Sequence, residues 1–527
     1  MKKNKQVSTD TKQSSKRRII LLPIVYILLA LSAILVVASV YKAKAFGDSQ
    51  IDEIIFYLTN GLSTGQSGSI VDAVRDNILF AGILFFVMLL PVVDFYRDKI
   101  RIHFDLSLFG RPRKVNFNPS RMPLWLKVSY ATVVFVISLA VLLQSFGVFS
   151  YVRSLTQSST IFEDNYVDPK QANLKFPAKK RNLIYIYLES MENTNASKQN
   201  GGQAEKSTIP ELENIALDKN NVSFSNKSSG LGGALPAQGT TWTVGAMVAQ
   251  SSGVPLKANV MGDKQNSMDK LNKFLPGSYS IGDILKTQGY NQTFIMGSNA
   301  AFGGRDKMLT QHGSYQIQDY AYAKASGLIP DDYSVWWGYE DKKLFSFAKE
   351  ELGRLSSVDT PFNLQLLTVD THFTDGYMDE TCDKPFAAQY ANVHACSSKE
   401  VGEFIAWVQQ QPFYDNTTIV ISGDHLGMQT AYYENMATTP NYQRTIYNVF
   451  INSAVRPAHQ FDRQFSTLDM YPSTLAAMGV QIPDDRLALG TNLFADKKTL
   501  VEQYGSIGAL NRELSKRSNF YDRNILN

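Results

Sequence analysis

The feature that most constrains this chain is a run of 23 uncharged, mostly apolar residues at positions 19–41. A helix rises about 1.5 Å per residue, so this run is long enough to cross the roughly 30 Å hydrocarbon core of a bilayer. A secretory signal has a shorter apolar core and a small-residue cleavage site, so we interpret the run as a membrane anchor. The preceding residues 1–18 hold seven Lys and Arg, and we interpret them as a disordered cytoplasmic tail.

Two further apolar runs follow, at residues 78–93 and 128–152. We predict three transmembrane helices within residues 19–152, although the second run is short enough to be a buried core helix. The loop at 96–123 carries seven basic and two acidic side chains, whereas residues 42–77 carry three basic and five acidic ones. The positive-inside rule then places the N-terminus in the cytoplasm and everything after about residue 152 outside.

The exported part begins with residues 153–180, a polar, proline-containing stretch that we interpret as a linker. From residue 181 to 527, short apolar runs alternate with stretches of helical spacing. Buried strands are predicted at 183–188, 293–296, 364–369, 417–421 and 447–451, and helices at 340–352, 398–410 and 468–478. This alternation predicts an α/β sandwich with a mostly parallel central sheet.

Three of these predicted strands run directly into polar residues. The first ends at Glu189, the third at Asp370-Thr371-His372, and the fourth at Asp424-His425. Ligands bind at the carboxyl ends of strands in open α/β sheets, although a single acid there is more often a helix cap. Two carboxylates and an imidazole suit a divalent cation such as Mn²⁺, Mg²⁺ or Zn²⁺.

The segment 232–247, GGALPAQGTTWTVGAM, brings threonines to the start of an apolar helical pattern. A hydroxyl at this position either caps the helix or faces an anion held against the free N–H groups. Thr243 directly opens the helical pattern, as a nucleophile at a helix N-terminus should. A cation held by Glu189, Asp424 and His425 could include the Thr243 hydroxyl in its shell and lower its pKa.

Four motifs in order, YLESMENT (187–194), GTTWTVGAM (239–247), VDTHFTDG (369–376) and SGDHLGM (422–428), carry a family resemblance. Together with STLDMYPSTLAAMG (466–479), they resemble the phosphoglycerol transferase and lipoteichoic-acid synthase family. This is a sulfatase-like family with the alkaline-phosphatase fold, and the resemblance covers roughly residues 160–500.

The resemblance implies metal ligands at Glu189, Asp424 and His425, a threonine nucleophile that also contacts the metal, and one divalent ion, with Mn²⁺ favoured. Thr243 is the preferred nucleophile, and Thr241, which fits a QGxT alignment to the synthases, is the alternative. It implies that His372 belongs to the substrate site, where it could also act as a general acid or base. Arg305 resembles an arginine that holds the phosphoglycerol head group, although a surface loop charge is an equal alternative. A tryptophan that the synthases carry two residues before this arginine is Gly303 here.

The implied reaction transfers glycerophosphate from phosphatidylglycerol, through a glycerophosphoryl-threonine, to a periplasmic glucan or another cell-surface glycan. The implied location is the bacterial inner membrane, with several spans and the catalytic domain on the periplasmic side. The partners are a lipid donor, a glycan acceptor and the membrane, and no nucleic acid.

A lipoteichoic-acid-synthase-like polymerase and a phosphoethanolamine transferase are the alternatives within this fold. The latter usually has several disulfides, whereas this chain has only Cys382 and Cys396. These two could form one disulfide outside the cytoplasm, or stay unpaired. A sulfatase activity would require a C/S-x-P-x-R motif, which this threonine loop lacks. A glycan-binding domain without activity would be expected to lack some of the site residues, and none is missing.

Overall fold

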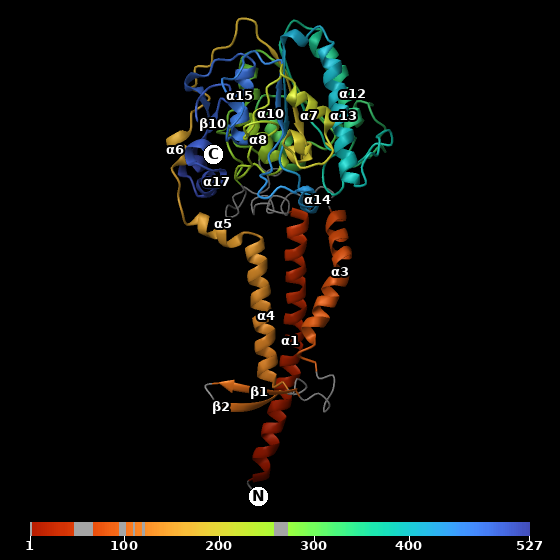
Figure 1. The fold of residues 1–527 in the computed structure, drawn as a ribbon, viewed down its shortest axis with the longest axis vertical. Helices are drawn as coiled ribbons and strands as arrows, with labels where there is room; N and C mark the ends of the chain where they lie inside the picture. Colours follow the sequence, from red (N-terminus) through yellow and green to blue (C-terminus); the bar gives the residue numbers. More distant parts are fainter. Residues whose placement is uncertain are drawn as a thin grey trace. The chain divides into compact units, whose positions relative to one another are not determined.

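The computed structural model describes residues 3–46, 67–93, 102–108, 111–117, 122–257 and 272–526. They divide into two compact units, one within residues 1–149 and one that includes residues 150–527, and each is described by itself. Figure 1 labels their elements along the chain.

The described residues of the N-terminal unit form three long helices and a pair of strands. Its elements are α1 (Lys3–Phe46), α3 (Ser67–Leu89), β1 (Ile102–Leu108), β2 (Arg111–Phe117) and α4 (Leu124–Ser145), followed by α5 (Val148–Leu155). Val25 and Leu29 of α1 pack with Ala131 of α4 and with Val92, and Lys127 Nζ donates to Val92 O at 2.6 Å. The strands β1 and β2 pair antiparallel.

Two of the described helices are long and apolar enough to cross a membrane, at Ile19–Ala43 and Leu124–Ser145. The predicted second span corresponds to a shorter apolar helix, Asn77–Leu89, so a three-span topology stays a prediction. The predicted third span, residues 128–152, is not one helix. It is interrupted after Ser145, where Gly147 has φ +68° and ends α4 in the left-handed conformation that glycine adopts easily.

The predicted disorder of residues 1–18 is wrong, because α1 begins at Lys3. The physical reason is propagation. Lys, Gln and Arg are good helix formers, and a helix already nucleated by the apolar run extends into them at little cost.

The interpretation of residues 153–180 as a linker is also wrong. The short helix α6 (Ile161–Asn165) buries Ile161 and Phe162 completely in the core of the second unit. Val167 and Lys175 then form β-bridges with Ala488 and Gln481. Burying each of these two apolar side chains contributes about 2 kcal/mol, which outweighs the polar composition of the rest of the segment.

The second unit is built on a six-stranded sheet in the order β5-β4-β6-β3-β7-β8. The strands are β3 (Asn182–Leu188), β4 (Asn291–Met296), β5 (Gln316–Gln318), β6 (Phe362–Leu367), β7 (Thr417–Gly423) and β8 (Asn448–Ile451). All neighbours pair parallel except β7 and β8. The mostly parallel sheet and its five predicted strands are confirmed. The three-residue strand β5 was not predicted, because it is too short to show a pattern.

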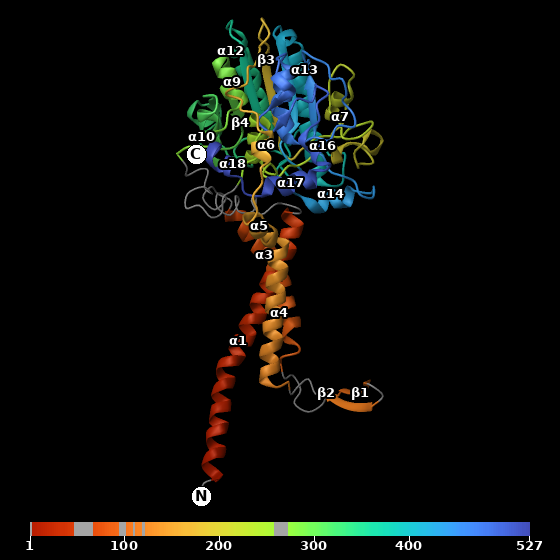
Figure 2. The same ribbon diagram turned by 90° about the vertical axis from the view of Figure 1, so that its left-hand side faces the viewer.

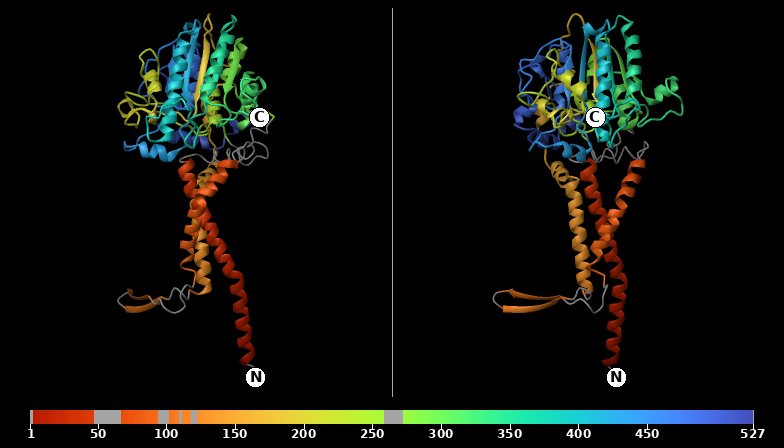
Figure 3. Two further views of the ribbon diagram at one scale, coloured as in Figure 1. Left: turned by 90° about the vertical axis from the view of Figure 1, so that its right-hand side faces the viewer. Right: turned by 45° about the vertical axis from the view of Figure 1, so that its right-hand side comes forward.

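Helices cover both faces of this sheet, as Figures 2 and 3 show from two sides. Side chains of β3 alternate between two cores, because successive residues of a strand point to opposite faces. Tyr185 and Tyr187 lie in one core and Ile184 and Ile186 in the other.

The remaining helices are α7 (Pro210–Leu217), α8 (Thr243–Ser252), α9 (Ile281–Thr287), α10 (Arg305–Gln311), α11 (Tyr320–Ala325), α12 (Asp341–Ser356), α13 (Gln389–Gln409), α14 (Thr430–Met436), α15 (Met470–Ala477), α16 (Leu500–Tyr504), α17 (Ile507–Ser515) and α18 (Asn519–Asn524).

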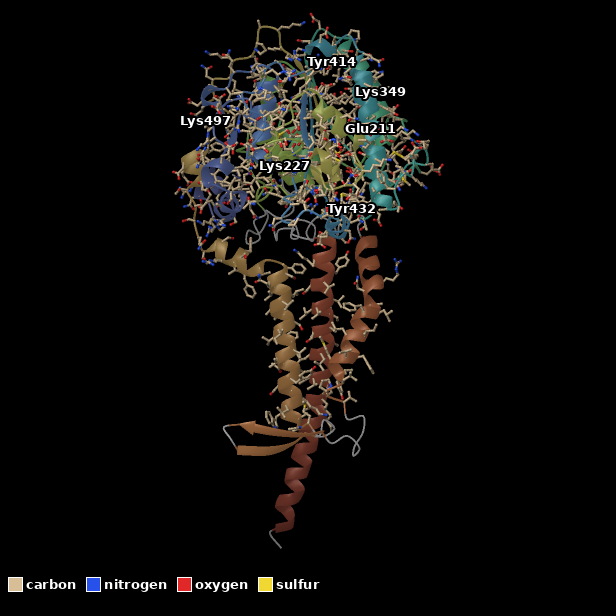
Figure 4. The ribbon with its side chains drawn as sticks, viewed as in Figure 1. Glu211, Lys227, Lys349, Tyr414, Tyr432 and Lys497 are labelled. Atoms are coloured by element: carbon tan, nitrogen blue, oxygen red, sulfur yellow. A yellow bond between two sulfur atoms is a disulfide. The ribbon has the colours of Figure 1, made fainter. Side chains whose placement is uncertain are left out.

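Helices α7, α12 and α13 supply the core that contains Ile184 and Ile186. Polar contacts fix α7 against α13: Ser398 Oγ donates to Glu211 Oε2 at 2.8 Å and accepts from the backbone N–H of Glu211 at 3.1 Å. Lys349 of α12 lies 5.7 Å from the Trp407 ring centre on α13. Glu211 and Lys349 are labelled in Figure 4. The helices on the other face include α8, whose N-terminus is part of the site below.

Candidate metal centre and active site

The register of two neighbouring strands brings the first metal-ligand candidates together. Leu188, the last residue of β3, pairs with Gly423, the last residue of β7. The next residue on each strand is therefore an acid, Glu189 and Asp424, and Asp424 N donates to Leu188 O at 2.9 Å. Glu189, Asp424 and His425, called here the metal cluster, are almost completely buried, and one ligand atom from each lies within 4.8 Å of the others.

The hydrogen bonds of the metal cluster direct its lone pairs toward one another. His425 Nδ1 lies 2.8 Å from Leu426 O, and a carbonyl only accepts, so Nδ1 carries the proton. The lone pair of the neutral ring is then on Nε2, which lies 3.6 Å from Glu189 Oε1 and 3.5 Å from Asp424 Oδ2. Three electron-rich atoms at these distances repel one another unless a cation lies between them.

Asp424 gives a second indication of a cation. Its Oδ1 accepts N–H bonds from Ser190 at 2.8 Å and His425 at 2.7 Å, whereas the buried Oδ2 has no hydrogen-bond partner among the described residues. Burial, with the neighbouring Glu189, raises the pKa of Asp424 to about 7. Burial also acts on Glu189, but His425 and His372, together with hydrogen bonds from Ser190 and Asp424, outweigh it and lower the pKa of that carboxyl. The donor set of two carboxylates and one imidazole therefore fits a divalent metal ion.

Thr243 is the first residue of α8, and its hydroxyl lies beside the metal cluster. Thr243 Oγ1 donates to Glu189 Oε2 at 3.3 Å. The N-cap residue is Trp242, so the Thr243 hydroxyl is not the cap of this helix. Thr240 has a structural role, since its hydroxyl donates to Ala237 O at 3.0 Å and accepts from Thr467 at 3.1 Å. Thr241 lies two residues before the helix.

His372 and Arg305 both interact electrostatically with Glu189 of the metal cluster. His372 follows β6, and its Nδ1 lies 2.7 Å from Phe373 O, so Nε2 carries the lone pair of the neutral ring. Burial lowers the pKa of His372, and the nearby Glu189 opposes this shift. The neutral ring can therefore accept a proton near neutral pH.

Arg305 opens α10 and is only 4% exposed, so the alternative of a surface loop charge is wrong. Its guanidinium donates to Phe302 O at 3.0 Å, Asn299 O at 2.7 Å and Ser298 Oγ at 3.1 Å. These contacts hold the charged group in place, while burial lowers the pKa of Arg305 to about 10 and leaves it protonated at neutral pH.

Two sets of supporting contacts were not predicted. Gln250 of α8 donates to Gly423 O at 3.0 Å and accepts from the Tyr185 hydroxyl at 2.6 Å, which ties the threonine helix to the end of β7. Glu192 accepts from Gly427 N at 2.8 Å and from Arg444 Nε at 2.8 Å.

Because Arg444 Nη2 also donates to Gly427 O at 2.6 Å, the Glu192–Arg444 pair joins the loops that carry the metal cluster. Glu192 stands three residues after Glu189 in the YLESMENT motif. This position in the motif was the only feature of the sequence that could have indicated its role.

Asp370, the third strand-end acid, is not part of the metal cluster. Its Oδ2 accepts from Asp341 N at 3.1 Å, and Asp341 in return accepts from the N–H groups of Val369 at 2.8 Å and Asp370 at 3.1 Å. Asp341 and Asp370, called here the acid pair, thus connect the start of α12 to the end of β6. This connection supports the segment that leads to His372.

Cys382 and Cys396 form a disulfide that joins the segment before α13 to that helix. The sequence left their pairing open. The cross-link closes a short loop in the chain that follows His372, and it constrains the unfolded state of this loop.

The sulfatase family model matches residues 181–480, more than half of the chain. The chain belongs to the sulfatase family. This sulfatase-family protein is 33% identical over 298 residues to phosphoglycerol transferase I of Xanthomonas axonopodis pv. citri, over 55% of this chain and 40% of that relative. It is 32% identical over 292 residues to phosphoglycerol transferase I of Escherichia fergusonii, over 53% of this chain and 36% of that relative.

The matched region thus spans less than half the length of these two curated relatives. Among solved structures, the sulfatase-family chain is similar to the lipoteichoic acid synthase LtaP of Listeria monocytogenes. The identity is 18% and the TM-score 0.47, over 62% of this chain and 79% of that one. The match of the family model to residues 181–480 confirms the expected sulfatase-like family.

Proposed function

We propose that this protein is a membrane-anchored phosphoglycerol transferase that uses Thr243 as its nucleophile. The proposal rests mainly on the position of the Thr243 hydroxyl. Its Oγ1 lies 3.3 Å from Glu189 Oε2, at the edge of the metal cluster. The relatives named phosphoglycerol transferase I support the transfer of a phosphoglycerol group, for which we propose phosphatidylglycerol as the donor.

The proposed reaction has two displacements at phosphorus. In the first, Thr243 Oγ1 bonds to phosphorus, the bond to the diacylglycerol oxygen breaks, and diacylglycerol leaves with the proton. In the second, an acceptor hydroxyl bonds to phosphorus, the bond to Thr243 breaks, and Thr243 recovers a proton. In this proposal, His372 Nε2, which carries the lone pair of the neutral ring, accepts the proton of the acceptor hydroxyl. Arg305 offers a preorganised guanidinium to the phosphoryl oxygens.

Glu189, Asp424 and His425 would hold one divalent ion, with Thr243 at its edge. Mn²⁺ is our preferred ion, and Mg²⁺ and Zn²⁺ are the alternatives. When bound, the cation supplies positive charge that lowers the pKa of a hydroxyl and offsets negative charge on a phosphoryl group.

We place the catalytic unit on the outer face of a bacterial inner membrane, held by the N-terminal helices. The charge difference between the loops supports this orientation, and the Cys382–Cys396 disulfide suits an oxidising compartment. An anchored site stays near its lipid donor, which raises the effective donor concentration. The proposed acceptor is a periplasmic glucan or another surface glycan. A growing polyglycerolphosphate chain is the alternative acceptor, and phosphatidylethanolamine is the alternative donor.

The test is incubation of the full-length protein with labelled phosphatidylglycerol and Mn²⁺, followed by mass spectrometry of the protein. A glycerophosphoryl group on Thr243 is expected. Thr243→Ala should reduce diacylglycerol release by at least about 1,000-fold, because the bond-forming atom is missing, while Thr241→Ala should keep most of it. The reverse result would assign the nucleophile to Thr241. An adduct from phosphatidylethanolamine in place of phosphatidylglycerol would contradict the proposed donor.

A further inference from the structure

A tight turn next to His372 carries two consecutive tryptophans, Trp336 and Trp337. Val335 and Gly338 close the turn with two backbone hydrogen bonds of 2.9 Å each. Gly338 forms a β-bridge with Ser298, and Tyr339 N donates to Gly297 O at 3.0 Å. The turn is therefore fixed to the chain just beyond β4, where Ser298 also accepts a hydrogen bond from Arg305.

Trp336 occupies a backbone conformation that is unfavourable for it. Its φ is +55°, in the left-handed region where glycine is favoured, and such a residue costs of order 1–3 kcal/mol. Its side chain is 40% exposed, although Nε1 donates to Val369 O at 3.2 Å. Among the described residues of the second unit, Trp336 and Phe461 are the exposed aromatic side chains. A strained backbone that presents a large apolar ring to solvent indicates a ligand contact.

Trp337 extends this aromatic surface to the candidate active site. Its ring centre lies 4.7 Å from that of His372 and 5.8 Å from that of Phe302. The Arg305 guanidinium lies 5.5 Å from the Phe302 ring. The turn thus connects the exposed indole of Trp336 to the residues that would hold the phosphoryl group and accept the proton of the acceptor.

We propose that the Trp336–Trp337 turn is a binding subsite for a sugar ring of the acceptor glycan. The proposal rests on the transferase function above and names where its acceptor binds. The apolar C–H face of a pyranose packs on an indole, while its hydroxyl groups remain available to polar neighbours. A ring bound here would place a nearby hydroxyl group at His372.

The surroundings of the turn favour a sugar over the lipid donor. The segment before the turn exposes Asp331, Asp332 and Ser334. The carboxylates of Asp331 and Asp332, five and four positions before Trp336, can accept hydrogen bonds from the hydroxyl groups of a neutral sugar. The same carboxylates repel an anionic lipid surface. An acyl chain would require a wider continuous apolar surface than one exposed indole.

The decisive variant is Trp336→Gly, because glycine favours the positive φ and removes the indole without threatening the fold. The matched control is Phe461→Ala, which removes another exposed aromatic ring of this unit. The full-length protein is titrated with a neutral glucose oligosaccharide by calorimetry, and diacylglycerol release from phosphatidylglycerol is measured without acceptor. We expect Trp336→Gly to weaken oligosaccharide binding about tenfold and to leave diacylglycerol release within about twofold. Phe461→Ala should change neither.

Trp337→Phe keeps an aromatic ring against His372 and should bind the oligosaccharide more tightly than Trp337→Ala. The subsite is excluded if the wild-type protein binds no oligosaccharide, or if Trp336→Gly binds it as tightly as the wild type. Loss of diacylglycerol release with unchanged sugar binding would assign the turn to the donor lipid instead. If the wild type releases no diacylglycerol and Trp336→Gly still loses the sugar, the subsite stands and the proposed transferase function fails.

Discussion

Two groups of buried acids lie at neighbouring strand ends of one sheet, yet they have different partners. The acid pair, Asp341 and Asp370, exchanges hydrogen bonds with the backbone N–H groups of its own two segments. In the metal cluster, Asp424 Oδ2 accepts none from the described residues, and it faces the lone pair of an imidazole. The acid pair joins two elements by hydrogen bonds, whereas the metal cluster directs two carboxylates and an imidazole toward one another, a donor set that suits a cation.

Burial alone does not distinguish the two groups. It raises the pKa of Asp341 and of Asp424 to about 7, and it raises the pKa of Asp370 well above its ordinary value. Asp370 Oδ1 also lacks a hydrogen-bond partner among the described residues, so an unpartnered buried oxygen does not by itself indicate a metal ligand. Asp424 differs in its neighbour, because His425 Nε2 lies 3.5 Å from its Oδ2. The neighbouring atoms, and not depth, therefore distinguish the metal cluster from the acid pair.

The largest expected effect is that of Asp424→Asn. The amide oxygen can still accept the N–H groups of Ser190 and His425, but the anionic ligand atom is lost. Mn²⁺ affinity, measured by calorimetry on the full-length protein, should fall by more than about 100-fold. The melting temperature of the metal-free variant should not fall, because an unpaired buried charge has been removed. Unchanged Mn²⁺ binding would contradict the assignment of the metal cluster.

An intermediate effect is expected for Glu192→Gln. The neutral amide weakens the bonds to Arg444 and Gly427, which join the two ligand-bearing loops. Mn²⁺ affinity should fall by about 10-fold, the range found for residues that support metal ligands. The matched control is Glu351→Gln, which removes the charge of another buried acid paired with an arginine, Arg354. This control should lose stability and keep its Mn²⁺ affinity; equal losses of affinity in both variants would contradict a positioning role for Glu192.

The smallest effect on metal binding is expected for Asp341→Asn, which should change Mn²⁺ affinity by less than about threefold. One backbone N–H loses its acceptor, so stability should fall by about 1–3 kcal/mol, seen as a melting temperature lower by several degrees. A large loss of Mn²⁺ affinity would show that the acid pair and the metal cluster act as one site.

The same variant tests the raised pKa of Asp341, which faces Asp370, Glu340 and Glu189. A carboxyl with a folded pKa of about 7 and an unfolded pKa near 3.8 binds more protons in the folded state between these pH values. Its contribution to stability is therefore lost as pH rises from about 4 to 7. Melting curves of the metal-free protein between pH 5 and 8 should show this loss, and Asp341→Asn should have a flatter profile.

Much of this protein could be predicted from short stretches of sequence. Apolar runs marked the five strands, and the residue that follows a strand could be identified as an acid or a histidine without any knowledge of its neighbours. The position of Thr243 at the start of α8 and the mostly parallel sheet could be predicted in the same way. These features depend on contacts between residues close in the chain, and side-chain periodicity reports such contacts directly.

Other predictions failed where distant contacts decide the structure. The linker interpretation missed Phe162, because its burial depends on Phe520 and Tyr521, more than 300 positions later. The third span was predicted across Gly147, where one backbone conformation ends the helix. Arg305 was ambiguous until its contacts with Ser298 and Asn299 placed it in the interior.

The sequence by itself determined which residue types stand at the strand ends and at the helix start. Only the tertiary structure decided that Glu189 and Asp424 are adjacent while Asp370 bonds to Asp341. The physical reason is the sheet order: β3 lies between β6 and β7, and the pairing of strands far apart in the chain depends on long-range packing. The same packing places the Trp337 ring against the His372 ring. The sequence around Trp337 and the sequence around His372 do not indicate this contact.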